Sequence, residues 1–150
     1  MGPTVRIVTK SPVDVSVILE AVQAKSDSME GDDFWINERP FNVSFGEEYE
    51  GELAELKDVK DWLGWIPHGM IGFSAMCNDA IDHKILGDLS IEFALLLDGV
   101  VDFGAPLNGY TKDPQFLSSN QDLCDWNGNH MMRPKIFKEW LNHPDFRMVK

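Results

Sequence analysis

Hydrophobic and polar residues alternate along several segments of this chain, and this alternation predicts β-strands. Val5 and Ile7 fall on one face of the first of these segments, and Arg6 falls on the other. A longer, mostly apolar run that begins at Met70 is typical of a strand at the centre of a sheet. The predicted strands cover residues 4–10, 34–36, 41–45, 70–77 and 100–103, and residues 146–149 are expected to close a sheet edge.

Hydrophobic residues at three- and four-residue steps predict helices elsewhere in the chain. The first helix is expected to begin at Pro12 with Ser11 as its cap, and a later one to follow a cap at Asp82. Gly99 is expected to end that later helix in the left-handed conformation. The predicted helices cover residues 12–26, 53–63, 83–98 and 134–140, with loops over 26–33 and 104–129, the second containing one helical turn near Gln115.

The order of these elements predicts an α+β fold. We expect residues 1–150 to form a single domain, with a mixed or antiparallel sheet and about four helices packed mainly on one face. A chain of 150 residues that is 43% hydrophobic is long enough to bury one core. It contains no apolar run of the roughly 20 residues that cross a bilayer, no secretory signal and only two cysteines, so we expect a cytoplasmic protein with no membrane contact.

Acidic charge is concentrated in one part of the chain. The 25 Asp and Glu residues outnumber the 13 Lys and Arg residues, which gives a formal net charge of −12. Much of the excess lies in two acidic segments, residues 27–33 and residues 47–61. Such a negative field opposes nucleic acid as a direct ligand, because phosphate binding needs a positive surface. The same field attracts a basic protein, unless it serves only to keep a scaffold domain in solution.

The residues expected to contact a partner combine this acidic charge with one aromatic side chain. Carboxylates provide electrostatic attraction, and a tryptophan ringed by charge is typical of an interface hot spot. The predicted partner-binding residues are Asp32, Asp33, Trp35, Glu47, Glu48, Glu50, Glu52, Glu55 and Asp58.

Two cysteines and two histidines suggest a different chemistry. Cys77 lies six positions before His83, and Cys124 lies six positions before His130, so the four could bind zinc if the segments met in space. Cys77 with His83 or His68 could also act as a nucleophile and its base, although surrounding carboxylates disfavour the thiolate. The spacing is wider than in known zinc modules, and no phosphate-binding loop is present. No cofactor and no enzymatic activity are therefore predicted, and a metal-binding protein or small enzyme remains the alternative.

A resemblance supports a role in protein binding. It is carried by IGFSAMCN at 71–78, Asp82 with His83, Leu86 with Gly87, GVVDFG at 99–104 and the ending WLNHPDFRMVK at 140–150. These segments resemble a family of small, uncharacterised bacterial proteins that are similar to the immunity proteins of polymorphic toxin and contact-dependent inhibition systems. The resemblance implies an antitoxin whose partner is a cognate protein toxin, for which a nuclease with a basic cleft is one candidate. It brings no catalytic residue to this chain.

Overall fold

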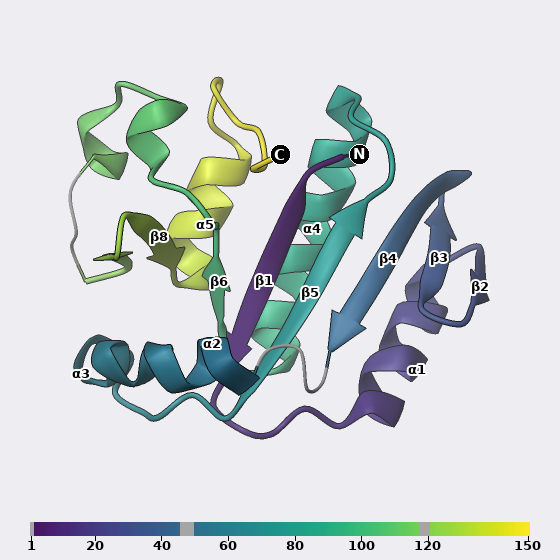
Figure 1. Cartoon of the computed structure of the whole chain (residues 1–150). Helices are drawn as coiled ribbons and strands as arrows, with labels where there is room; N and C mark the ends of the chain where they lie inside the picture. The colour runs from purple at the N-terminus through teal and green to yellow at the C-terminus, as the bar shows by residue number, and fades with distance from the viewer. Residues whose placement is uncertain (1, 46–49, 118–120) are drawn as a thin grey trace.

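The computed structural model describes residues 2–45, 50–117 and 121–150, and its centre is an eight-stranded sheet (Figure 1). The strand order is β2-β3-β4-β5-β1-β6-β8-β7, and every neighbouring pair is antiparallel. The strands are β1 (Thr4–Thr9), β2 (Ser28–Glu30), β3 (Asp33–Ile36), β4 (Arg39–Phe45), β5 (Gly69–Ala75), β6 (Val100–Asp102), β7 (Leu123–Trp126) and β8 (Asn129–Met132).

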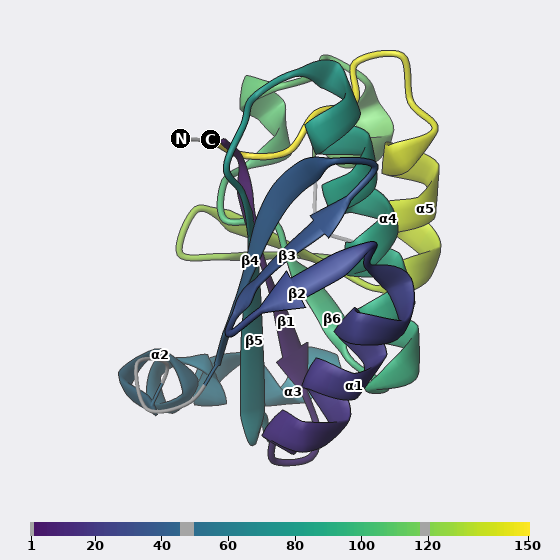
Figure 2. The same cartoon turned by 90° about the vertical axis from the view of Figure 1, so that its right-hand side faces the viewer.

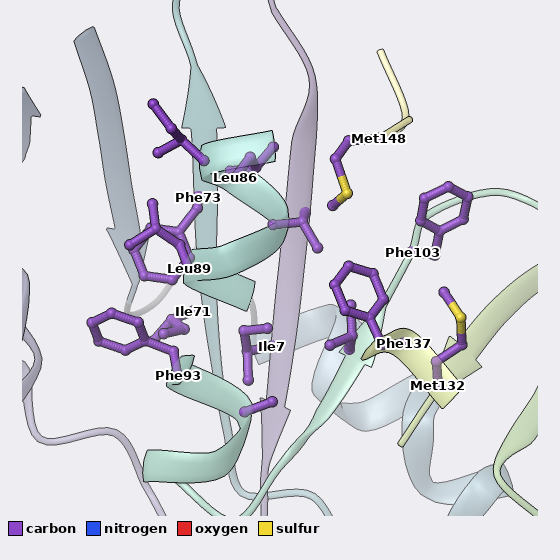
Figure 3. Close-up of a cluster of buried hydrophobic side chains, with 14 of the residues drawn as sticks. Ile7, Ile71, Phe73, Leu86, Leu89, Phe93, Phe103, Met132, Phe137 and Met148 are labelled. Atoms are coloured by element: carbon purple, nitrogen blue, oxygen red, sulfur yellow. The ribbon is translucent and has the colours of Figure 1, made fainter. Parts of the chain in front are cut away.

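Three helices cover one face of this sheet. They are α1 (Val15–Lys25), α4 (Ala80–Leu96) and α5 (Pro134–Leu141), and Figure 2 shows all three on the same side. Between them and the sheet lies the main core, in which Phe73, Phe93 and Phe137 are fully buried (Figure 3). The predicted α+β class, with helices mainly on one face of an antiparallel sheet, is therefore confirmed.

A short helical segment packs on the opposite face, at one end of the sheet (Figure 2). It consists of α2 (Glu50–Glu55), the 3-10 turn η2 (Leu56–Val59) and α3 (Lys60–Leu63). Leu56, Val59 and Leu63 form a second, smaller core with Val8 and Met131. The single helix predicted over 53–63 is thus three short pieces, although its apolar residues do face the sheet and it ends at Gly64, as the sequence indicates.

Two of the predicted helix starts are wrong by several residues. Helix α1 begins at Val15, because the carboxylate of Asp14 accepts hydrogen bonds from the first-turn amides, so neither Ser11 nor Pro12 has the expected role. Helix α4 begins at Ala80 after Asp79, and Asp82 lies in its first turn. There Asp82 accepts a hydrogen bond from the Asp79 amide at 2.8 Å. An aspartate caps both helices, Asp14 in place of the predicted Ser11 and Asp79 in place of the predicted Asp82.

The end of α4 also differs from the prediction. Asp98 takes the left-handed conformation, with φ of 51°, and Gly99 does not. Gly99 is needed for a different reason, because a Cβ there would lie 2.4 Å from the carbonyl oxygen of Val8 in the neighbouring strand. The glycine therefore permits the close approach of β1 to the chain that enters β6.

The regions predicted as loops contain additional strands. Residues 26–33 include β2, and residues 104–129 include β7 and the start of β8 as well as two 3-10 turns, η3 (Leu107–Gly109) and η4 (Pro114–Phe116). The turn expected near Gln115 is confirmed by η4. Val149 forms a single bridge to Thr4 instead of a strand at a sheet edge. Within the described part of the chain, every helix is too short or too polar to cross a membrane.

Candidate functional site

Part of the sheet face opposite the three long helices is not covered by the α2–α3 segment, and its residues are polar and small. Strand alternation explains why, because each residue between two core residues points away from the core. Asn42 and Ser44 alternate with buried Phe41 and Val43 on β4, and Arg6 alternates with core residues on β1. We refer to this uncovered, polar part of the sheet as the open face; it is on the viewer's side in Figure 1, above α2.

The open face contains a depression of about 540 Å³. The strand register explains its depth, because Gly72 and Ser74 on β5 lie directly beside the residues of β4 and β1 and have little or no side chain. The polar side chains that line it come from four adjacent strands: Thr4 and Arg6 from β1, Asn42 and Ser44 from β4, Ser74 from β5, and Asp102 from β6. Hydroxyl, amide, guanidinium and carboxylate groups thus share one concave surface.

Arg6 lies at the floor of the depression between two carboxylates. It forms ion pairs with Glu52 from α2 and, at 3.0 Å, with Asp102 from β6. Asp102 is only 2% exposed, and burial raises its pKa even though Arg6 and the amide of Gly104 both favour its charged form. Two carboxylates therefore share one guanidinium, and this group of three side chains has one more acidic than basic member.

The first acidic segment, residues 27–33, borders the same depression on the side of β3 and β4. Asp33 on β3 accepts a hydrogen bond of 2.8 Å from the side-chain amide of Asn42, which lines the depression. Glu30 lies directly opposite Asp33 across the β2–β3 pair and therefore points to the same face. Because Arg6 joins Glu52 to one wall and Asn42 joins Asp33 to the other, the two acidic segments of the sequence flank one concave surface.

The other predicted contact residues occupy different positions around this surface. Asp32 is exposed at the β2–β3 turn, and Trp35 is half-buried on the open-face side of β3, opposite Pro40. Glu50 and Glu55 are exposed on α2. Asp58 is exposed on η2, whose apolar residues are turned toward the sheet, and it does not line the depression. Glu47 and Glu48 lie outside the described residues.

The polar floor of the site was not among the predicted contact residues. Arg6, Asn42 and Ser44 do have a signal in the sequence, because each interrupts an alternating apolar pattern on the side away from the core. Asp102 has no such signal, since it lies in a short apolar run that reads as fully buried. Only the order of the strands brings Asp102 beside Arg6.

The structure does not assemble Cys77, His83, Cys124 and His130 into a metal site. Cys124 and His130 lie on opposite faces of the β7–β8 hairpin, because Cys124 is directly opposite Met131, whereas His130 is opposite Asp125. Nδ1 of buried His130 accepts a hydrogen bond from the Leu107 amide at 2.9 Å, and burial lowers the pKa of His130. Among the described residues, no group of three or more His, Cys, Asp or Glu side chains is placed to hold a metal ion.

The imidazoles near Cys77 also have structural hydrogen bonds. In His83, Nδ1 accepts from the Met148 amide at 2.9 Å and Nε2 donates to the side-chain oxygen of Asn78 at 3.1 Å. Burial lowers the pKa of His83, which keeps the ring neutral and suited to this pattern. His68 bonds the carbonyl of Lys10 through Nδ1 at 3.0 Å. These contacts hold chain segments together, and they occupy both ring nitrogens of His83 and Nδ1 of His68.

Comparison with known protein families places the whole chain in one of them. The family described as "Family of unknown function (DUF6368)" matches residues 1–150, so the chain belongs to this family. Neither the curated proteins nor the solved structures include a significant match to it.

Proposed function

We propose that this member of the DUF6368 family is a cytoplasmic immunity protein that binds and occludes a cognate basic toxin through its open face. The observation that carries the proposal is the depression flanked by both acidic segments, with Glu52 bonded at one wall and Asp33 at the other. A concave polar surface of this kind accepts a basic loop of another protein and supplies hydrogen-bond partners along its floor.

Charge supports the same partner. Four carboxylates lie on or beside the open face: Glu30, Asp33, Glu52 and Asp102. Among the described residues that line the depression, Arg6 is the one cation. Complementary fields raise the rate of encounter between a negative surface and a positive one, and they suppress binding of other acidic proteins. A toxin that acts on nucleic acid has a positive cleft, and a row of carboxylates can occupy it in place of phosphates.

Trp35 supplies the apolar contact that such an interface needs. Trp35 is half-buried on the same side of the sheet as Asp33. It lies on β3, the strand next to β4, at the rim of the open face. Partly exposed tryptophans surrounded by charge are enriched among the residues that dominate interface affinity. Charge then accelerates association, and the aromatic contact slows dissociation.

A growth-protection assay tests this proposal. The candidate toxin, the C-terminal domain of the protein encoded by the adjacent reading frame, is expressed in a bacterial host together with the wild-type protein or with a triple variant. The triple variant carries Asp32→Lys, Glu50→Lys and Glu55→Lys, all at exposed positions. Protection is expected from the wild type and not from the triple variant, because three reversed charges repel a basic partner.

A matched control separates the local surface from the net charge. The control triple variant carries Glu20→Lys, Asp88→Lys and Glu139→Lys, at exposed positions on α1, α4 and α5, on the opposite side of the sheet. Both variants change the net charge by the same amount, so the control is expected to protect as the wild type does. Equal protection by all three proteins would contradict the proposed binding face.

A further inference from the structure

A second pocket has the opposite charge and adjoins the open-face depression, because Val149, which lines the depression, lies between Met148 and Lys150 of this pocket. It measures about 620 Å³ and is formed where the end of the chain passes the start of α4 and the η3 turn. Figure 1 shows the yellow C-terminal segment at the same end of the molecule as the first turn of α4. The two charged side chains that line this pocket are Arg147 and Lys150.

The pocket is notable because the rest of the surface is so acidic. In a chain with a net charge of −12, the residues that line this pocket and that the structure describes include two cations and no Asp or Glu. Acidic residues close in the chain to the lining residues have partners elsewhere: Asp79 and Asp82 are bonded by Arg39, and Asp145 accepts a hydrogen bond from the Thr111 hydroxyl at 2.8 Å. No acidic side chain among the described residues that line the pocket therefore neutralises these two cations.

Arg147 is positioned by an aromatic contact, and Lys150 is an exposed side chain at the edge of the pocket. The guanidinium of Arg147 lies over the ring of Tyr110, with Cζ 5.0 Å from the ring centroid. The Met148 amide between them is fixed to His83 at 2.9 Å. Burial is the main cause that lowers the pKa of His83, and Arg147 and Lys150 act in the same direction, in agreement with the presence of all three residues in the pocket lining.

We propose that this pocket binds an oxyanion, a phosphate or carboxylate group of a small molecule. Arg147 supplies a planar donor that matches two oxygens of such a group, and Lys150 supplies a second charge. The side-chain amide of Asn78 and the backbone at Gly109 line the same space and add neutral polar groups. A neutral His83 does not compete for the ligand, because both of its ring nitrogens are already bonded. The site does not depend on the proposed immunity function.

Nuclear magnetic resonance titration of the full chain tests this inference. Inorganic phosphate, sulfate and acetate are added separately at a constant ionic strength of about 150 mM, so that general screening does not change. The amides of Gly109, Tyr110 and Met148 are expected to shift in a saturable manner, with a dissociation constant on the order of 1–10 mM for a small ion. Tighter binding of phosphate than of acetate identifies a phosphate site, and the reverse order identifies a carboxylate site.

Two double variants decide whether the shifts report this pocket. Arg147→Gln with Lys150→Gln is expected to weaken binding at least about tenfold, because both charged donors are lost. Lys135→Gln with Lys138→Gln removes the same charge from exposed positions on α5 and is expected to bind as the wild type does. If Arg147→Gln disturbs folding through Tyr110, Lys150→Gln alone, at an exposed side chain, is expected to weaken binding about threefold. Shifts that do not saturate, or that are equal in both double variants, would overturn the proposal.

Discussion

Replacement of Arg6 by methionine tests the electrostatic arrangement at the floor of the open face. Asp102 is 2% exposed and Arg6 is 28% exposed, and their ion pair measures 3.0 Å. Removing one partner of a buried pair typically costs about 3–5 kcal/mol of unfolding free energy, because the remaining charge is left without compensation. The depression admits water and the Gly104 amide still donates to Asp102, so we expect Arg6→Met to cost about 2–3 kcal/mol at neutral pH.

The pH dependence of this loss has a definite sign. Burial already raises the pKa of Asp102, and removal of Arg6 eliminates an interaction that lowers it, so the pKa in the folded variant rises further. A carboxyl group whose pKa is higher in the folded than in the unfolded state destabilises the protein above the folded pKa. This effect disappears as the group becomes protonated at lower pH. The difference in stability between variant and wild type is therefore expected to shrink as the pH falls from about 7.5 to about 4.5.

Urea unfolding of three variants at both pH values provides the measurement. Arg6→Lys retains the charge and is expected to lose less stability than Arg6→Met. The double variant Arg6→Met with Asp102→Asn removes the uncompensated charge and is expected to recover at least about 1 kcal/mol relative to Arg6→Met. A loss of stability that is the same at both pH values, together with no recovery in the double variant, would contradict this prediction. That result would show that Arg6 does not stabilise the charged form of Asp102.

Three further outcomes follow from the structure. Gly99→Ala is expected to lower the unfolding free energy by roughly 1–3 kcal/mol in urea, because the new methyl group meets the Val8 carbonyl oxygen at 2.4 Å; an unchanged midpoint would refute this packing. Phe73→Ala empties a fully buried site and is expected to cost about 3–5 kcal/mol in the same assay, whereas a cost below about 1 kcal/mol would contradict its place in the core. Elemental analysis of the purified protein is expected to find no stoichiometric zinc, because Cys124 and His130 lie on opposite faces of one hairpin; one zinc per chain would argue against that register.

Strands in which apolar and polar residues alternate strictly could be predicted from the sequence. The hairpin of β7 and β8 could not, because of the residue types it contains. Its strands contain Cys124, Asp125 and His130, which have little intrinsic preference for strands, and the segment therefore resembles a loop. The turn itself did carry a signal, because Asn127 and Gly128 both adopt positive φ, of 51° and 83°, as a two-residue hairpin turn requires. Turn chemistry was the better guide here than strand propensity.

The candidate site was predictable only in part. Alternation identifies Arg6 and Asn42 as residues that point away from the core, and the acidic segments are plain in the sequence. The spatial arrangement of these residues could not be predicted, because the sheet order places β5, β1 and β6 side by side although these strands are far apart in the chain. The contact of Arg6 with both Glu52 and Asp102 depends on that order and on the packing of α2.

The rate of association with the toxin domain tests the central claim most directly. Stopped-flow measurements at low and high salt compare the wild type with the open-face triple variant (Asp32→Lys, Glu50→Lys, Glu55→Lys) and the helix-side triple variant (Glu20→Lys, Asp88→Lys, Glu139→Lys). The open-face variant is expected to associate about tenfold to a hundredfold more slowly at low salt and to lose most of its salt dependence, while the helix-side variant stays within about threefold of the wild type. Equal slowing of the two variants, or wild-type kinetics in both, would show that the open face does not receive the partner.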